Sequence, residues 1–209
     1  MFTTITSVIN TYNEEKTIEQ CLKSISWCDE IVIVDMHSSD DTLRIIKSYT
    51  DKVYTYKKKL YVEPARNFAI SKAEGDWILI IDADETIPSN AEIIIKNIIN
   101  NKIIDGYWFP RRQYIKKNIW LHHGYFYPDW QLRLFRNYKG YKFSGKIHEP
   151  IRIPRKKTKY IHDLIIHHNF THSKYNSIFS IVRMIRYIRV EGTNYAAIKI
   201  SLFKLFLKL

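Results

Sequence analysis

Cysteine, glycine and proline are scarce in this chain of 209 residues, which has two, six and six of them. Cys21 and Cys28 form neither a Cys-x-x-Cys pair nor a larger framework, so a disulfide scaffold and a thiolate zinc site are excluded. So few glycines and prolines also exclude a low-complexity or fibrous chain. The chain is 45% hydrophobic and 14% aromatic, which is enough for a sizeable core, and its cysteine usage fits a reducing, cytosolic setting.

Long uncharged hydrophobic runs are missing as well. No stretch reaches the roughly 18 apolar residues that a membrane-spanning helix needs, because Arg and Lys residues interrupt even the apolar C-terminal region. Residues 1–4 lack the basic start and apolar stretch of a secretory signal. We therefore expect a cytoplasmic protein that does not span a membrane.

Charge is divided unevenly between the two halves of the chain. Residues 1–100 carry 11 basic and 16 acidic groups, whereas residues 101–209 carry 22 basic and 5 acidic groups. The second half therefore has a net charge of +17, within a total of +12. Basic residues interleaved with Tyr and Trp leave a nucleic-acid-binding module open as an alternative.

The hydrophobic pattern alternates between strands and helices, which predicts an α/β sheet with parallel strands. Ile31–Val34 and Trp77–Ile81 are apolar on both faces, as in strands buried between helices. Asn13 is expected to cap the first helix, and Ser89 with Glu92 to form a capping box. The remaining expected elements are a strand at 4–10, helices at 18–25, 42–49, 64–69 and 93–99, an extended segment at 53–56, and a helical pattern from 174 onward.

Acidic residues stand at the ends of the predicted buried strands. Asp35 follows one of them, and Asp82, Asp84 and Glu85 follow another. Ligands collect at the carboxyl ends of strands in open α/β sheets, and in an extended segment Asp82 and Asp84 would face one side. Such a pair suits Mg²⁺ or Mn²⁺ and a phosphorylated ligand; the alternative is a solvated turn or helix cap. The same acids would also suit a nucleotidyltransferase.

The sequence contains no glycine-rich phosphate-binding loop that would accompany these acidic residues. The sequence contains no Gly-x-Gly-x-x-Gly motif. The Walker-like string from Gly140 to Lys146 continues with Ile147, where a Ser or Thr is needed to reach the metal. A P-loop NTPase is thereby excluded.

Four motifs stand in register over about 85 residues of the first half. They are Thr11-Tyr12-Asn13-Glu14-Glu15, Ile33-Val34-Asp35 with Ser38-Ser39-Asp40-Asp41-Thr42, Arg66-Asn67, and Gly75-Asp76-Trp77 running into Asp82-Ala83-Asp84-Glu85. In this order they resemble family 2 glycosyltransferases. In the second half, Tyr127–Phe135 and Lys146-Ile147-His148-Glu149 look like the subgroup with lipopolysaccharide core β-glucosyltransferases.

This resemblance implies the GT-A fold, an α/β nucleotide-binding sheet with flanking helices. It divides residues 1–172 into a nucleotide-sugar-binding half at 1–105 and an acceptor-binding half at 106–172, followed by a basic, amphipathic helical tail at 173–209. The implied enzyme is an inverting, metal-dependent hexosyltransferase. It would transfer a hexose such as glucose from a nucleotide sugar, expected to be UDP-linked, to a cell-envelope glycolipid such as lipopolysaccharide core.

The resemblance also implies roles for single residues. Thr11 and Tyr12 would pack on the uracil base, Glu14 would reach the ribose, and Asp35 would accept a hydrogen bond from the base. The residues implied at the diphosphate and metal are Arg66 and the Asp82-Ala83-Asp84 motif. Asp84 is the preferred metal ligand, and Asp82 is expected nearer the ribose and behind the metal.

The general base and a third metal ligand are less sharply indicated. The family places the base in a Glu-Asp pair, and here Pro128-Asp129 matches it, so Asp129 is the candidate and Glu149 the rival. The alternative for Asp129 is an ion pair with Arg133 or Arg136. His168, after an apolar run, is a candidate metal ligand of the kind that GT-A enzymes take from a late strand, against ordinary packing.

The last segment is amphipathic. Between residues 173 and 189, isoleucine and valine recur at helical spacing while Arg183, Arg186 and Arg189 recur every three residues. Such a helix can lie in the headgroup region of an anionic leaflet, which would make the protein peripheral on the cytoplasmic face of the inner membrane. The alternative is a helix packed on the sheet.

Overall fold

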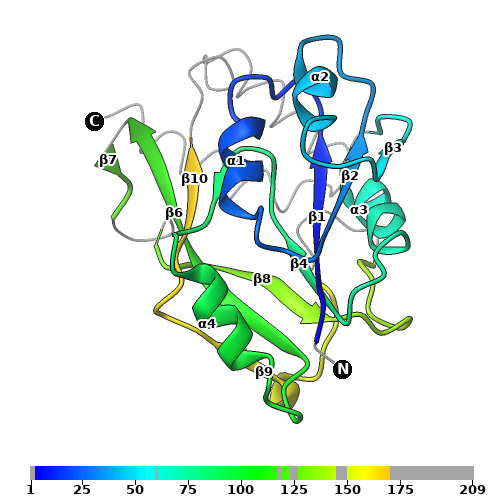
Figure 1. The fold of residues 1–209 in the computed structure, drawn as a ribbon. Coiled ribbons are helices and arrows are strands. Elements are labelled where there is room, and N and C mark those ends of the chain that lie inside the picture. Colours follow the sequence, from blue (N-terminus) through cyan, green and yellow to red (C-terminus); the bar gives the residue numbers. More distant parts are fainter. Residues whose placement is uncertain (1–2, 60, 117–118, 123–126, 145–149, 170–209) are drawn as a thin grey trace, which may run out of the picture.

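The computed structural model describes residues 3–59, 61–116, 119–122, 127–144 and 150–169 (Figure 1). The expected tail at 173–209 therefore lies outside the described residues, as does Glu149. Within the described ranges, no helix is long and apolar enough to cross a membrane.

The first half is a parallel sheet, as the sequence predicts. The strands are ordered β3-β2-β1-β4, and each neighbouring pair is parallel. Helices alternate with them along the chain. The bounds are β1 Ile5–Thr11, α1 Ile18–Ser24, β2 Glu30–Asp35, α2 Thr42–Ile46, β3 Val53–Thr55, α3 Glu63–Ile70 and β4 Trp77–Ile80.

The second half extends the same sheet with antiparallel pairs, which the alternation of strands and helices did not predict. β8 lies antiparallel between β4 and β6, and β10 runs parallel to β6 on its other side. The path ends in β5, while β7 and β9 also pair with β6. The bounds are β5 Glu85–Thr86, α4 Ala91–Ile98, β6 Gly106–Lys116, β7 Ile119–Trp120, β8 Asp129–Arg136, the 3-10 turn Arg155–Lys157, β9 Thr158–Tyr160 and β10 Ile166–Asn169.

Helices cover both faces of the sheet (Figure 1). Strand residues alternate between the faces, so Ile9 packs with α1 and α4 on one side, and Val8 packs with α3 on the other. Ile33 and Val32 of β2 divide in the same way. Double-sided burial explains why β2 and β4 are nearly continuous apolar runs.

The helix starts differ from the sequence prediction. Asn13 has a φ of 55° in a loop, and α1 begins only after Thr17, so the prediction that Asn13 caps this helix is wrong. The residue before α4 is Asn90, and no side chain caps that helix, so the capping box of Ser89 and Glu92 is also wrong. In both places a loop conformation replaces the cap that the local pattern predicted.

Candidate functional site

The carboxyl ends of β1, β2 and β4 meet at one edge of the sheet. Thr11 is paired with Asp35 in the parallel register, and Val8 with Ile80, so the segment after β4 begins beside the end of β1. Parallel strands bring their carboxyl ends together at one edge, which is where ligands bind in open α/β sheets. The acidic residues after the strands therefore converge, as the sequence predicts.

Two loops at this edge are tied together by side-chain hydrogen bonds. The Asn13 amide nitrogen donates to Ser38 Oγ at 2.9 Å, and Asn13 Oδ1 accepts from the Ser39 amide at 2.8 Å. Asp35 is buried, and its two carboxylate oxygens accept from the Ser38 hydroxyl at 2.6 Å and the Ser38 amide at 2.9 Å. Asp35 therefore fixes the loop after β2.

The other residues expected at the nucleotide lie at the end of β1 and on the loop that follows it. Thr11 is 1% exposed, and its hydroxyl has no hydrogen-bond partner among the described residues. The Tyr12 ring lies 3.0 Å below the Lys58 Nζ atom, measured to the ring centroid. Glu14 accepts from the Thr17 hydroxyl at 2.9 Å. The site therefore has a buried polar atom, an aromatic ring and a carboxylate at the end of β1 and on the loop after it.

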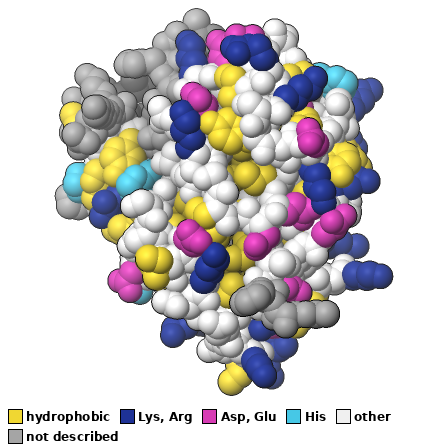
Figure 2. Space-filling model, in the orientation of Figure 1, with side chains coloured by type: hydrophobic (Ala, Val, Ile, Leu, Met, Phe, Trp, Pro, Cys, Tyr) yellow, Lys and Arg dark blue, Asp and Glu magenta, His cyan; other side chains and the backbone are white. Residues whose placement is uncertain are grey.

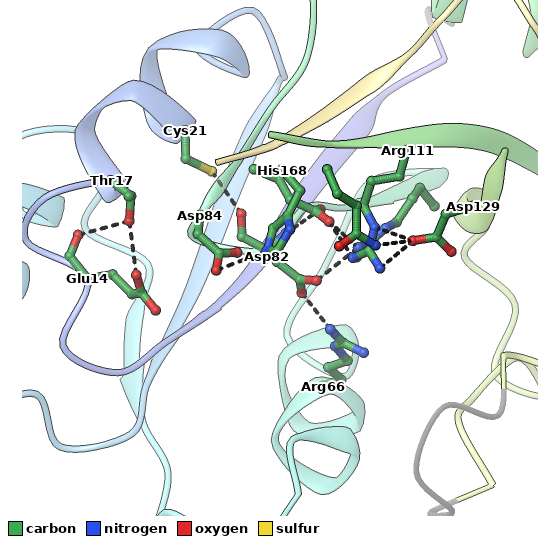
Figure 3. Close-up of polar contacts among 12 residues, drawn as sticks. Glu14, Thr17, Cys21, Arg66, Asp82, Asp84, Arg111, Asp129 and His168 are labelled. Atoms are coloured by element: carbon green, nitrogen blue, oxygen red, sulfur yellow. Dashed lines mark hydrogen bonds and ion pairs between the residues drawn. The ribbon is translucent and has the colours of Figure 1, made fainter. Parts of the chain in front are cut away.

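Asp82 is held by two arginines, of which Figure 3 labels Arg66. Arg66 of α3 forms an ion pair with Asp82 Oδ1, and Arg133 of β8 donates to Oδ2 at 2.9 Å. Burial by itself would raise the pKa of the Asp82 carboxyl, but Arg133 and Arg66 outweigh it and hold that pKa well below its usual range. Asp82 is therefore ionised, and both of its oxygens have guanidinium partners.

Asp84 faces a different partner. Its Oδ2 lies 3.3 Å from Nε2 of His168, and both side chains are largely buried. Residues 83 and 84 form a turn, so the alternation expected of an extended Asp82–Asp84 segment does not apply. Ala83, between them, is buried. The structure thus brings His168 from β10 to Asp84, and it separates the environments of the two carboxylates.

Glu85 connects this motif to the candidate base. It is fully buried, and its Oε1 accepts from Arg133 at 2.7 Å and from Arg111 of β6 at 3.0 Å. Arg111 in turn pairs with Asp129 Oδ2 at 2.6 Å. Burial lowers the pKa of the Arg111 guanidinium, but Glu85 and Asp129 raise it above its ordinary value. A chain of alternating charges therefore runs from Arg66 to Asp129 (Figure 3).

Asp129 has three side-chain donors around it. Besides Arg111, Gln113 donates to its Oδ2 at 3.0 Å and Gln131 to its Oδ1 at 2.6 Å. The pairing considered from the sequence, with Arg133 or Arg136, is not the one observed, because Arg133 binds Asp82 and Glu85. The strand register explains this, since Asp129 stands opposite Arg111 in the β6–β8 pairing.

The sequence interpretation missed the role of Glu85 and did not anticipate Arg111, Gln113 or Gln131. Glu85 carried a signal, because it stands with Asp82 and Asp84 at the strand end. Arg111 carried none, because its position depends on antiparallel pairing between β6 and β8. Glu149, the rival base, lies outside the described residues.

The side chains at this edge determine whether a divalent cation could bind there. Within the described parts of the chain, no group of three His, Cys, Asp or Glu side chains is arranged to hold a metal ion. Asp84 and His168 do bring a carboxylate and an imidazole together. Mg²⁺ and Mn²⁺ sites at nucleotides use one or two protein ligands and complete the shell with phosphate oxygens and water. The pair therefore fits a metal that arrives with a diphosphate, and does not form an all-protein cage.

The sequence is similar to those of known glycosyltransferases. Residues 6–159 match the family model described as Glycosyl transferase family 2. The SPbeta prophage-derived glycosyltransferase SunS of Bacillus subtilis (strain 168) is 33% identical over 185 residues, 86% of this chain and 43% of SunS. The lipopolysaccharide core biosynthesis glycosyltransferase LpsC of Rhizobium meliloti (strain 1021) is 32% identical over 152 residues, 66% of this chain and 53% of LpsC. The chain spans about half the length of these curated relatives.

A solved structure shows the same fold. The crystal structure of S. aureus TarS 1-349 matches with a TM-score of 0.60 and 16% sequence identity, over 90% of this chain and 66% of that one. The fold is a mixed sheet with flanking helices of the GT-A type, which confirms the fold that the sequence motifs implied.

Proposed function

Because this chain belongs to glycosyl transferase family 2, we propose that its strand-end site transfers a hexose, such as glucose, from a UDP-sugar to a cell-envelope glycolipid. The observation that carries the proposal is the meeting of Thr11, Asp35, Asp84 and His168 at one edge of the sheet. A structure of TarS in complex with UDP-GlcNAc shares the fold with a TM-score of 0.59 and 16% identity, which supports UDP as the nucleotide.

Polar atoms without partners support a nucleotide at this edge. Among the described residues, the side-chain amide of Asn10, the hydroxyl of Thr11 and Nε of Arg66 are buried without a hydrogen-bond partner. Buried polar groups without partners are costly, and a ligand that supplies hydrogen bonds would remove this cost. We assign the base and ribose to the loop of Thr11, Tyr12 and Glu14, with Asp35 beneath it, and the diphosphate to Arg66.

Asp84 and His168 would hold Mg²⁺ or Mn²⁺ in this proposal. The bound metal would neutralise charge that builds on the departing UDP. Asp82 contributes differently, because Arg66 and Arg133 already occupy its oxygens. Its ionised carboxylate orients Arg66, and the remaining guanidinium nitrogens of Arg66 are then presented to the diphosphate.

An inverting transfer needs one carboxylate to take the proton of the acceptor hydroxyl as it attacks the anomeric carbon. Asp129 is our candidate, since Arg111 links it to Glu85, which follows the metal-binding Asp84 in the sequence. Three side-chain donors, from Arg111, Gln113 and Gln131, already surround its carboxylate. Glu149 therefore stays the alternative, and the two are separated by experiment.

The acceptor class is supported by the relative LpsC, whose name places it in lipopolysaccharide core biosynthesis. The excess of basic residues in the second half would favour an acceptor that carries phosphate groups. Contact with the cytoplasmic face of a membrane through residues 173–209 remains a prediction. On the face shown in Figure 2, acidic side chains lie among the basic ones, which gives no separate basic patch for nucleic acid.

The test is release of UDP from a panel of UDP-sugars in the presence of Mn²⁺ and a lipid-linked oligosaccharide fraction. We expect one UDP-hexose to be consumed and Asp84→Ala to abolish the metal-dependent rate. Loss of turnover in Asp129→Asn, with UDP binding retained and Glu149→Gln active, would assign the base to Asp129. The reverse pattern would assign it to Glu149, and full activity of Asp84→Ala would refute the metal assignment.

A further inference from the structure

A second polar cluster lies on the opposite face of β6 from the network that holds Asp129. Side chains alternate along a strand, so Arg111 and Gln113 face Asp129 while Arg112 and Tyr114 face away. Trp120 of β7 pairs with Tyr114 in the antiparallel register and so shares the face of Arg112. Nothing in the proposed donor site uses these side chains.

The guanidinium of Arg112 lies over two neighbouring aromatic rings. Its guanidinium carbon lies 4.6 Å from the Trp120 ring centroid and 5.9 Å from that of Tyr127. Trp120 also contacts His122 and Tyr127, with centroid distances of 3.8 Å and 4.8 Å. A stacked guanidinium is held in a fixed plane and keeps its nitrogen edge available for an anion. We refer to Arg112, Trp120 and Tyr127 as the Arg112 cluster.

Among the described residues, Arg112 differs from the nearby arginines because no carboxylate pairs with it. Arg66, Arg111 and Arg133 each pair with a carboxylate of the candidate site. No described carboxylate forms an ion pair with Arg112, and its Nε is buried without a hydrogen-bond partner. A partly buried cation without a counter-charge is unfavourable, so this position is complementary to an anionic ligand.

His167 adds an imidazole to the same face. It stands opposite Arg112 in the β6–β10 register, and its ring lies 5.2 Å from that of Tyr114. This face therefore presents a hydrogen-bonding ring beside the guanidinium of Arg112.

We propose that the Arg112 cluster is an acceptor subsite for an anionic sugar, one bearing a phosphate or a carboxylate. The guanidinium would bind the anion, and the aromatic rings would pack against the apolar face of the sugar ring. Tyr127 is two residues from Asp129, so the segment that carries the candidate base also carries one ring of the cluster. Because it lies on the other face of β6, it would contact a sugar other than the one that is glycosylated. This inference rests on the proposed glycosyl transfer.

The test is calorimetric titration of the full chain with glucose 6-phosphate, glucuronate, inorganic phosphate and neutral glucose. We expect both anionic sugars to bind and neutral glucose to bind about tenfold or more weakly. Arg112→Gln should weaken the anionic sugars about 10- to 100-fold. Arg112→Lys should weaken them less, because it keeps the charge but loses the planar fork. The matched control is Arg155→Gln, at an exposed arginine of the 3-10 turn, which should bind as wild type.

Two comparisons separate this inference from the donor site. Asp84→Ala should bind the anionic sugars as wild type does, because the cluster does not include the metal pair. The unfolding midpoints of the Arg112 variants, compared with wild type, show whether a loss of sugar binding comes from misfolding. If Arg112→Gln does not fold, the binding of Arg112→Lys decides the question. Equal binding of neutral and charged sugars, or wild-type affinity in folded Arg112→Gln, would overturn the inference. If inorganic phosphate bound as tightly as glucose 6-phosphate, the proposed contact between the aromatic rings and the sugar would be overturned. Failure of UDP to bind would count against the donor site alone.

Discussion

Replacing Glu85 with Gln should destabilise the fold strongly, because it removes one charge from a balanced buried network. Three carboxylates, on Asp82, Glu85 and Asp129, face three guanidinium groups in this network. Glu85 is fully buried and is shared by Arg111 and Arg133. Glu85→Gln leaves an excess positive charge there, and an amide NH₂ at the position that accepts the Asp82 backbone N–H.

The magnitude follows from the cost of an uncompensated buried charge. Removal of one partner from a buried ion pair costs about 3–5 kcal/mol. For a chain of this size, about 2–4 °C of melting temperature corresponds to 1 kcal/mol, so Glu85→Gln should melt roughly 6–20 °C below wild type. Urea unfolding followed by tryptophan fluorescence and scanning calorimetry measure the two quantities.

The matched control is Glu92→Gln, which removes an exposed carboxylate paired with Lys96 one helical turn away on α4. Exposed pairs of this kind contribute little, so the control should melt within error of wild type. If Glu85→Gln also melted within error of wild type, the network would not be the stabilising, charge-balanced unit argued above.

Three further outcomes are expected. The free energy of unfolding should fall as the pH drops below about 4, because the pKa of Asp82 is depressed in the folded state. The contribution of Asp82 to stability is complete above its unfolded pKa and is lost on acidification. Urea titrations from pH 7 to pH 2 should show a smaller loss of stability in Asp82→Asn than in wild type. Gly75→Ala should cost about 1–3 kcal/mol in urea unfolding, since its Cβ would lie 2.8 Å from a β1 backbone nitrogen, whereas Gly140→Ala meets nothing within 4 Å; equal stability would contradict the packing. Burial raises the pKa of the Cys21 and Cys28 thiols, so a thiol reagent at pH 8 should label neither in the native protein and both in urea; rapid native labelling of Cys21 would show that its site opens.

The parallel half of the fold could be predicted because its signals are local. The runs that become β2 and β4 are apolar on both faces, and each is followed by an acid. Such a run indicates a strand buried between helix layers, and this can be predicted without knowing which distant residues it contacts. The convergence of Asp35, Asp82 and Asp84 follows from the parallel order alone.

The antiparallel half and its charges could not be predicted for the opposite reason. Arg111 reaches Asp129 only because β6 pairs with β8. The sequence pattern within either segment does not indicate which strand it pairs with. His168 was predicted from the family resemblance, since its neighbour Asp84 is 84 residues away in sequence. Helix starts failed because Asn13 takes a left-handed loop conformation in which its side chain binds Ser39.

The most direct test of the central claim is calorimetric titration of the wild-type chain and of Asp84→Ala with UDP, with and without Mn²⁺. The account predicts that wild type binds UDP and that Mn²⁺ strengthens this binding. It also predicts that Asp84→Ala, with an unchanged melting temperature, loses the enhancement by Mn²⁺. Absence of UDP binding to folded wild type, or the same Mn²⁺ enhancement in Asp84→Ala, would contradict the assignment of the strand-end site as a metal-assisted donor site.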